Sequence, residues 1–402
     1  MRIFRPADIL IPNVKDISAW SVVACDQFTS EPEYWREVHA LADGKPSALH
    51  LILPEAELGI KDPAVESEKI NKAMSEYLDN GVFAEYPDSF VYVERTLADG
   101  TVRRGIVGMF DLEAYDWREG THTAIRATER TVEDRLPPRV RVRENAPLEM
   151  PHIMVFMDDP ENKVMSAVKR GEELYDLPLM MGGGSIKGWR VSDNAALEKA
   201  LSALDDGTDP EPMIFAMGDG NHSIAAAKQH WENVKKTVPP EKWESCPARY
   251  ALAELVNIHD PAIVFEPIHK LVYSTDPQSF ISEAREFFAD KLGGEREIKL
   301  VCGDKTENMR IGGFTLGQLI GACEDFCVSF TAKHGGSIDY IHGDETLVSL
   351  AQRDGCAGIM LPKMEKSELF SSVIKSGPFP KKSFSIGHGP DKRYYLECRR
   401  IK

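Results

Sequence analysis

The segment from Met213 to Ala227 constrains the fold of this chain more than any other. An apolar run over residues 213–217 leads into Gly-Asp-Gly-Asn at 218–221, and a helix is predicted from His222 to Val234. The small side chains of Ala225, Ala226 and Ala227 let this helix lie close to a sheet. A strand that turns into a helix in this way leaves backbone N–H groups at the positive end of the helix dipole. Such an end binds phosphate or carboxylate readily, so we predict an anion site here.

The residues of this turn are the types that phosphate chemistry uses. Glycine lets the main chain approach an anion closely, and a carboxylate or imidazole at the rim can serve as base, acid or metal ligand. The alternative is a structural turn in which Asn221 or Ser223 only caps the helix. The candidate ligand-binding residues are Gly220, Asn221 and Ser223, and the candidate catalytic residues are Asp219 and His222.

Six arginines lie close together in an otherwise acidic chain. Lys and Arg number 48 against 64 Asp and Glu, which gives a net charge of −16. The arginines are Arg126, Arg130, Arg135, Arg139, Arg141 and Arg143. Arginine recognises phosphate and carboxylate through a planar, bidentate fork. We predict a helix over Ile125–Leu136, ended by Pro137-Pro138, with Arg126, Glu129 and Arg130 on one face.

Three of these arginines, Arg126, Arg130 and Arg135, are candidate ligand-binding residues. Glu129 lies among positive charges that favour its ionised form, so it is a candidate base that accepts a proton from a hydroxyl. A solvated face of Arg–Glu pairs is the alternative interpretation.

A third basic segment lies near the end of the chain, where residues 379–384 read Phe-Pro-Lys-Lys-Ser-Phe. Lys381, Lys382 and Ser383 are candidate ligand-binding residues, although a solvated turn would look the same. We predict that a final hairpin, Lys382–Ile386 with Tyr394–Cys398, follows this segment. His269 and the tripeptide Cys25-Asp26-Gln27 are weaker candidates.

Helical and strand-like segments alternate along the chain, which predicts an α/β (α+β) fold with mixed sheets. We expect a main domain over residues 1–260 that holds the anion site. A smaller C-terminal α/β portion over residues 261–402 would follow, with its last hairpin returning to the site. Further predicted helices cover residues 32–41, 63–78, 161–174, 194–204, 345–352 and 366–374, and one begins at 276. Further predicted strands cover 48–53, 90–97, 102–112, 152–157, 250–258, 328–332, 338–342 and 357–361.

Composition argues against several classes of protein. A net charge of −16 repels nucleic acid and anionic membrane. The apolar runs are far shorter than the roughly 20 residues that span a bilayer, and the first residues lack the apolar core of a signal peptide. The seven cysteines include no CxxC pair, which is typical of reduced thiols in a reducing compartment. We therefore expect a soluble, cytoplasmic protein that binds neither membrane nor nucleic acid.

Four segments in this order resemble a bacterial and archaeal family, DUF1015, which has no assigned activity. They are Thr128-Glu129-Arg130-Thr131 with Asp134-Arg135, Asp219-Gly220-Asn221-His222, Pro267-Ile268-His269-Lys270 and Pro380-Lys381-Lys382-Ser383. The turn of that family usually reads Asp-Gly-His-His-Arg, so Asn221 replaces a histidine and Ser223 replaces an arginine here. The turn also resembles the phosphate-binding turn of the ParB and sulfiredoxin superfamily, which includes nucleotide-binding proteins and an archaeal free-serine kinase.

The helix-start site, the arginine cluster and a nearby Glu or Asp base predict a phosphotransferase that acts on a small hydroxylated metabolite, with free serine as the candidate that the resemblance suggests. Mg²⁺ with ATP, ADP or pyrophosphate is the expected cofactor set. The expected partner is a small anionic or phosphorylated ligand. The alternative is a non-catalytic sensor or regulator that binds a nucleotide or phosphometabolite in the same pocket. DNA binding of the partition-protein type is a third possibility, against which the acidic charge speaks. Each of these hypotheses predicts that the turn, the arginine segment and the terminal lysines form one cationic pocket.

Overall fold

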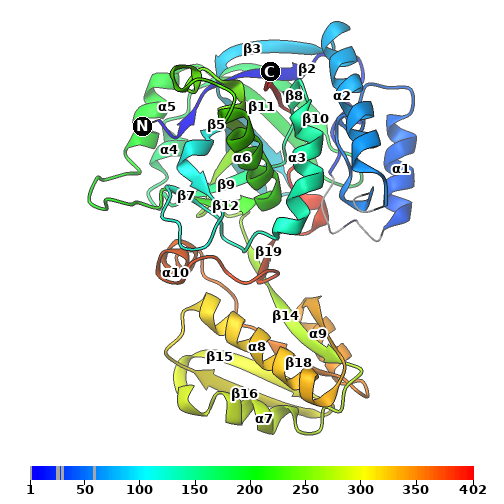
Figure 1. Ribbon diagram of the computed structural model, residues 1–402, viewed down its shortest axis with the longest axis vertical. Helices are drawn as coiled ribbons and strands as arrows, with labels where there is room; N and C mark the ends of the chain where they lie inside the picture. The colour runs from blue at the N-terminus through cyan, green and yellow to red at the C-terminus, as the bar shows by residue number, and fades with distance from the viewer. Residues whose placement is uncertain (1, 24–27, 29–30, 58–59) are drawn as a thin grey trace. The chain divides into compact units, whose positions relative to one another are not determined.

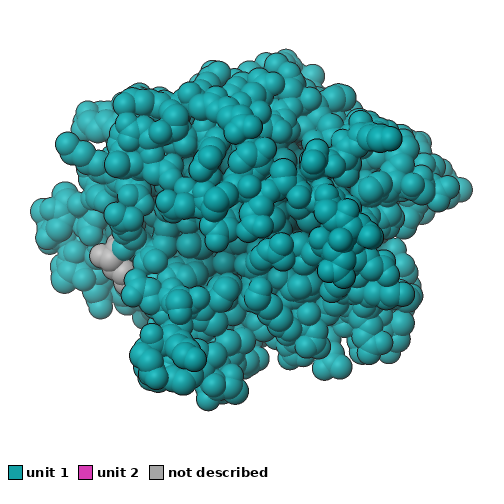
Figure 2. Space-filling model, turned by 90° about the horizontal axis from the view of Figure 1, so that it is seen from above, with its two compact units in different colours: residues 1–127, 131–263, 387–402 teal, residues 128–130, 264–386 magenta. Residues whose placement is uncertain are grey.

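The computed structural model describes residues 2–23, 28, 31–57 and 60–402, so Cys25-Asp26-Gln27 lies outside the described residues. The chain forms two compact units. Unit 1 comprises residues 1–127, 131–263 and 387–402, and unit 2 comprises residues 128–130 and 264–386. Figure 1 shows their elements, and Figure 2 shows one face of unit 1.

Unit 1 is built on a ten-stranded mixed sheet. Nine strands lie in the order β10 (Arg170–Pro178), β11 (Ser185–Val191), β4 (Val91–Thr96), β5 (Val102–Asp111), β13 (Tyr250–Asn257), β9 (Met154–Met157), β12 (Phe215–Asp219), β7 (Ile125–Arg126) and β6 (Tyr115–Asp116), and β1 (Phe4–Arg5) pairs with β5. Within it, β12 runs antiparallel to β9 and parallel to β7. The predicted strands 90–97 and 102–112 correspond to β4 and β5, which a turn at Asp99-Gly100 joins, with Gly100 at a φ of +87°.

A second, four-stranded sheet of unit 1 joins distant parts of the sequence. Its order is β3 (Phe83–Ser89), β2 (Ala7–Pro12), β20 (Cys398–Arg400) and β8 (Leu148–Glu149). The final strand thus lies between β2 and β8 and pairs antiparallel with both. The predicted final hairpin is wrong, because β20 pairs in unit 1 whereas β19 (Phe384–Ile386) pairs with β14 (Phe265–Tyr273) in unit 2.

The helices of unit 1 are α1 (Pro32–Ala42), α2 (Pro63–Asp79), α3 (Leu136–Glu144), α4 (Lys163–Ser166), α5 (Asn194–Ser202) and α6 (Asn221–Lys235). Asp62 caps α2, accepting a hydrogen bond from Ala64 N at 2.9 Å. α3 packs against both α2 and α6 (Figure 1). Two buried apolar clusters form the core, one around Trp20 and Ile9, the other around Trp231 and Phe110.

Three predicted elements of unit 1 are wrong. Residues 125–136 do not form one helix: they contain β7, a loop and a 3-10 turn at Glu133–Arg135. Pro137-Pro138 lies in the first turn of α3, where the missing N–H groups of proline cost nothing. Residues 161–174 give only α4 before β10 begins, since that segment pairs with β11. Residues 48–51 form a 3-10 helix and not a strand.

Unit 2 is a smaller α/β unit with a six-stranded sheet. Its order is β16 (Lys305–Ile311), β15 (Leu292–Cys302), β18 (Ala357–Met360), β14 and β17 (Ser337–His342), with β19 on the first residues of β14. Its helices are α7 (Phe280–Phe287), α8 (Leu316–His334), α9 (Asp344–Ala351) and α10 (Glu368–Ser376). The predicted strand 328–332 is wrong, because it lies inside α8, whose Phe326 and Phe330 pack on Phe280.

Together the two units confirm the predicted α+β class with mixed sheets. Among the described residues, the structure contains no helix that combines the length and apolar character needed to cross a membrane.

Candidate functional site

The turn between β12 and α6 has the predicted strand–turn–helix geometry. Gly220 precedes the first residue of α6 in a left-handed conformation, with a φ of +79°. A side chain there would be strained, and its Cβ would lie 3.0 Å from Ile153 Cα, just before β9. Gly220 also offers no side-chain oxygen to cap the first N–H groups of α6. The helix therefore begins without a side-chain cap, beside a close backbone contact.

Replacement of Gly220 by alanine is expected to lower the free energy of unfolding by more than the about 1–2 kcal/mol that a left-handed alanine costs. The excess comes from the contact with Ile153. Gly207→Ala is the matched control, because Gly207 has a φ of +71° and no atom within 4 Å of the added Cβ. Urea unfolding of both variants measures the difference, and equal losses would show that the contact at Gly220 costs nothing.

Asp219, the last residue of β12, is held by three polar groups. Its Oδ1 accepts a hydrogen bond from Gly220 N at 2.7 Å, and its Oδ2 lies 3.2 Å from Nζ of Lys392. Burial favours the neutral acid, but Lys392, His152 and the Gly220 N–H together hold the pKa of Asp219 below its usual value. Asp219 is therefore an ionised carboxylate beside a positive charge.

The two histidines near the turn are each oriented by a hydrogen bond. Nε2 of His222 accepts from Val132 N at 3.3 Å, which puts the proton of the neutral ring on Nδ1. Nδ1 of His152 lies 2.8 Å from the Tyr395 hydroxyl, and the two rings meet edge to face with centroids 5.4 Å apart. Asn221 adds a buried Oδ1 that has no hydrogen-bond partner within the described part of the chain. The turn thus presents acceptors as well as donors.

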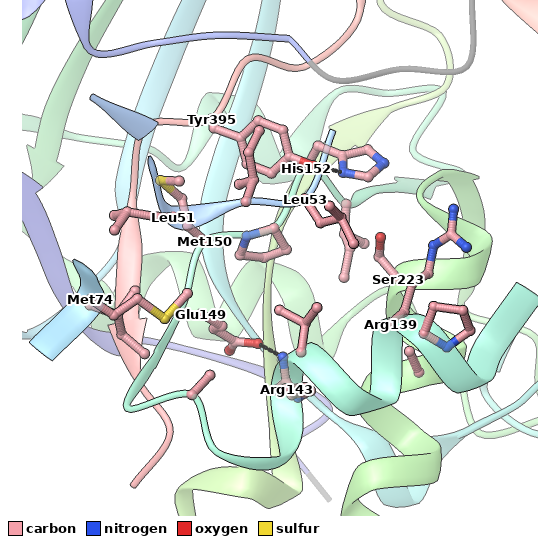
Figure 3. Close-up of a pocket in the computed structure, with 18 residues that line it drawn as sticks. Leu51, Leu53, Met74, Arg139, Arg143, Glu149, Met150, His152, Ser223 and Tyr395 are labelled. Carbon is pink, nitrogen blue, oxygen red and sulfur yellow. Dashed lines mark hydrogen bonds and ion pairs between the residues drawn. The ribbon is translucent and has the colours of Figure 1, made fainter. Parts of the chain in front are cut away.

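A cavity of about 160 Å³ opens beside the first turn of α6 (Figure 3). Its walls come from α6, α3, β8, the 3-10 helix at 48–51 and the segment before β9. Ser223, Arg139 and His152 lie on one side of it, and Leu51 and Met74 on the other (Figure 3). The cavity therefore joins one residue of the predicted anion turn, Ser223, to two cationic or titratable side chains.

A buried ion cluster forms the floor of this cavity. Oε2 of Glu149 accepts from Nη1 of Arg143 at 2.5 Å, and Oε1 accepts from Nε and Nη2 of Arg399 at 2.9 and 2.7 Å. Leu252 N donates to the same Oε1 at 2.9 Å. Burial opposes the charge, yet the two guanidinium groups and this N–H hold the pKa of Glu149 below its usual value. The two guanidinium groups share this one carboxylate, and the cluster supports the wall of the cavity.

The predicted arginine segment is divided between different roles. Arg126 is buried in β7, and its guanidinium donates to the carbonyl oxygens of Thr123 and Glu211 at 3.0 and 2.8 Å. Arg135 is exposed in the 3-10 turn before α3, and its carbonyl accepts from Arg139 Nη1 at 2.8 Å. Arg126 therefore stabilises a loop, whereas Arg139 and Arg143 both line the cavity.

Glu129 and Arg130 belong to unit 2, where they meet the predicted lysine segment. Phe379 N donates to Thr128 O at 2.7 Å, and Arg130 N donates to Phe379 O at 3.1 Å. Oε1 of Glu129 accepts from Ser383 N at 3.1 Å. Unit 2 therefore brings together two segments that lie about 250 residues apart in the sequence. The prediction of a shared pocket requires these two segments to be neighbours.

His269, Lys381 and Lys382 also belong to unit 2. Both ring nitrogens of His269 are used, because Nδ1 accepts from Leu361 N at 3.1 Å and Nε2 lies 2.9 Å from Asp344 Oδ1. Burial lowers the pKa of His269 despite the nearby Asp344 carboxylate. Lys381 and Lys382 are both exposed, and Lys382, with a φ of +54°, holds its ammonium 5.1 Å from the ring centre of Tyr340. Whether the two units share a ligand stays a prediction.

Lys392 and His152 are not among the candidate site residues identified from the sequence. Lys392 lies more than 170 residues beyond Asp219 in a stretch predicted as a hairpin turn. A lone His152 before a strand carries no pattern of its own. Only the packing of residues 387–402 into unit 1 and the pairing of β9 with β12 bring these side chains to the turn.

The fold and the site define a mixed α/β protein in which a strand–turn–helix with a left-handed glycine lies beside a cavity. The chain belongs to the family described as "Protein of unknown function (DUF1015)", which matches residues 4–371. No curated protein matches the sequence.

Solved structures with a similar fold are distant. C-terminally truncated SbnI from Staphylococcus aureus is 11% identical with a TM-score of 0.37, covering 70% of this chain and 82% of that chain. A free serine kinase in complex with AMP is 10% identical with a TM-score of 0.39, covering 73% and 91%. A conserved hypothetical protein from Pyrococcus furiosus is 11% identical with a TM-score of 0.35, covering 73% and 94%. At these TM-scores the likeness assigns no activity to this chain.

Proposed function

We propose that the protein is a small-molecule phosphotransferase whose phosphate site lies in unit 1, at the amino end of α6. The observation that carries this proposal is the cavity beside that helix end, with Ser223, His152 and Arg139 on one wall. A helix N-terminus with a glycine cap binds an oxyanion through its N–H groups, and the neighbouring positive groups add charge complementarity.

Each group of the site has a role in such a transfer. The N–H groups of the first turn of α6 hold the transferred phosphate, with the Ser223 hydroxyl and Arg139 at its side. The acceptor hydroxyl attacks phosphorus, the bond from phosphorus to the donor oxygen breaks, and the hydroxyl proton goes to Asp219. Phosphoryl transfer requires a protein mainly to position the reacting groups and to neutralise charge. The residues named above are of the types that these two tasks need.

A divalent cation fits this site only if the phosphate of the ligand supplies some of its coordinating oxygens. The described residues contain no cluster of three His, Cys, Asp or Glu side chains that could hold a metal. Mg²⁺ commonly binds through one or two carboxylates together with substrate phosphates and water, and Asp219 is the carboxylate available for that. When bound there, Mg²⁺ would neutralise charge on the phosphates.

The test is a phosphoryl-transfer assay on the full chain with Mg²⁺, free serine and related hydroxy acids. ATP, ADP and pyrophosphate serve as donors in separate reactions, followed by ³¹P NMR. We expect a phosphomonoester product with at least one pair of donor and acceptor. A sample of the Gly220→Ala variant is the control for contaminating kinases. The absence of turnover with every pair would contradict the transferase proposal.

A sensor of phosphorylated ligands is the second candidate, and one contact favours it. The ammonium of Lys392, 3.2 Å from Asp219, lowers the pKa of that carboxylate and so makes it a weaker base. A site that only binds would use the same turn and cavity without needing a base. The roles predicted for Glu129, Arg130, Lys381 and Lys382 stay predictions, since these residues belong to unit 2.

A further inference from the structure

The walls of the cavity are more apolar than a site for a bare phosphate requires. Among the described residues that line it, five are polar or charged and the others are aliphatic, thioether, proline or aromatic, including Leu51, Met74, Met150 and Tyr395. Met74, Met150 and Leu51 are buried at 3%, 6% and 2% exposure, so this surface is largely withdrawn from water. A phosphate ion cannot use such a surface, because burying a charge against apolar atoms is costly.

The polar part of the lining divides into two sets. Arg143 and Arg399 both bind the Glu149 carboxylate, so these three side chains form one ion cluster. Ser223, Arg139 and His152 form the other set and lie together at the α6 side of the cavity (Figure 3). The cavity therefore has one polar wall beside the start of α6 and one apolar wall.

The volume of the cavity limits what the apolar wall can hold. An apolar cavity of roughly 150 Å³ in a protein accommodates a benzene molecule, and this cavity measures about 160 Å³. Drug-sized ligands need about 300–1,000 Å³. The two methionines and Tyr395 are also suited to a flat ring, because thioethers and aromatic groups contact ring edges and faces favourably.

We propose that the ligand of this cavity is an oxyanion joined to an apolar group of about the size of a six-membered ring. The inference rests on the proposed function, since it names the class of compound that the phosphate site selects. The oxyanion lies at the start of α6 beside Ser223 and Arg139. The apolar ring lies between Met74, Met150 and Tyr395.

The test compares three probes by isothermal titration calorimetry on the full chain: inorganic phosphate, phenyl phosphate and phenol. Burying about 100 Å² of ring surface at about 25 cal/mol per Å² predicts that phenyl phosphate binds about 30- to 100-fold more tightly than phosphate. Phenol should bind much more weakly than phenyl phosphate, because it lacks the anion.

Two variants that fill the cavity separate the ring from the anion. Ala226→Leu adds side-chain volume from α6, and Leu53→Trp adds it from a half-buried position on another wall. In either variant, phenyl phosphate should bind no more tightly than inorganic phosphate, and the affinity for inorganic phosphate should change less than threefold. Ala195→Leu, on an exposed position of α5, is the matched control and should change neither affinity. The two filling variants come from different elements, so one of them remains informative if the other fails to fold.

The outcomes distinguish this inference from the function on which it rests. If phosphate binds but the phenyl group adds nothing, or if both filling variants keep the advantage of phenyl phosphate, the inference is overturned and the phosphate site stands. If phenol binds as tightly as phenyl phosphate, the link between ring and oxyanion is overturned. If neither phosphate nor phenyl phosphate binds, the proposed function itself fails.

Discussion

Replacement of Glu149 by glutamine is expected to lower the free energy of unfolding by about 3–5 kcal/mol. The carboxylate compensates two buried guanidinium groups, those of Arg143 and Arg399, whose side chains are 12% and 5% exposed. Glutamine keeps the shape but removes the charge, so both arginines would remain in a poorly solvated region without their counter-ion. Removing one partner of a buried ion pair costs far more than the pair contributes, because the remaining charge is uncompensated.

Equilibrium unfolding in urea, followed by tryptophan fluorescence and by circular dichroism, measures this loss. Glu76→Gln is the matched control, because Glu76 is 57% exposed and lies 3.6 Å from Lys72 on the surface of α2. Exposed pairs contribute roughly 0–1 kcal/mol, so the control should be nearly neutral. Similar losses in the two variants would mean that Glu149 is as well solvated as a surface carboxylate.

Replacement of Asp219 by asparagine is expected to lower the rate of phosphoryl transfer by about 10²–10⁴-fold, the usual contribution of a positioned base. Asparagine keeps the oxygen that accepts from Gly220 N, so the turn should stay folded and ligand affinity should change little. Rates with the best donor and acceptor, together with calorimetry, measure both quantities. Asp205→Asn, on an exposed loop, is the control and should leave the rate unchanged.

The pH dependence of the same reaction provides a second check on Asp219. Its pKa is lowered in the folded protein, so the carboxylate stays ionised at acidities where an ordinary aspartate, with a pKa near 3.9, begins to protonate. The activity of the base should therefore be retained down to about pH 4 and should be lost only on further acidification. Full binding and full turnover in the asparagine variant would exclude Asp219 as the base, whereas binding without any turnover in the native chain would favour the sensor.

Local sequence signals predict those elements of this fold that carry their own stop and start residues. Asp62 and Pro63 mark the start of α2, and Asp99-Gly100 marks the turn between β4 and β5. The predictions fail where neighbouring elements decide the outcome. The β-branched run from Val328 lies in α8, whose length is favoured by a capping box at Thr315 and Gln318 and by packing on Phe280.

The candidate site also has parts that local sequence signals predict and parts that depend on distant segments of the chain. The geometry of the turn at Asp219-Gly220 is predictable, because glycine between an apolar strand and small helical residues permits the left-handed conformation that this turn adopts. Arg126 and Arg139 look alike in sequence, yet one binds the carbonyl oxygens of a loop and the other reaches the cavity. Lys392 reaches Asp219 only because residues 387–402 belong to unit 1. Periodicity and spacing carry no information on such long-range placement.

The position of β20 between β2 and β8 has a consequence for biosynthesis. The strand β2, which pairs with β3 on one edge, has its other edge unpaired until residues 398–400 have been translated, and β8 has no strand partner in this sheet until then. Contacts across such long sequence separations form slowly, since the entropy of closing a large loop must be overcome first. The nascent polypeptide therefore carries an unpaired edge through most of its synthesis, and we expect it to depend on chaperones during that interval more than a chain whose sheets close in order of translation.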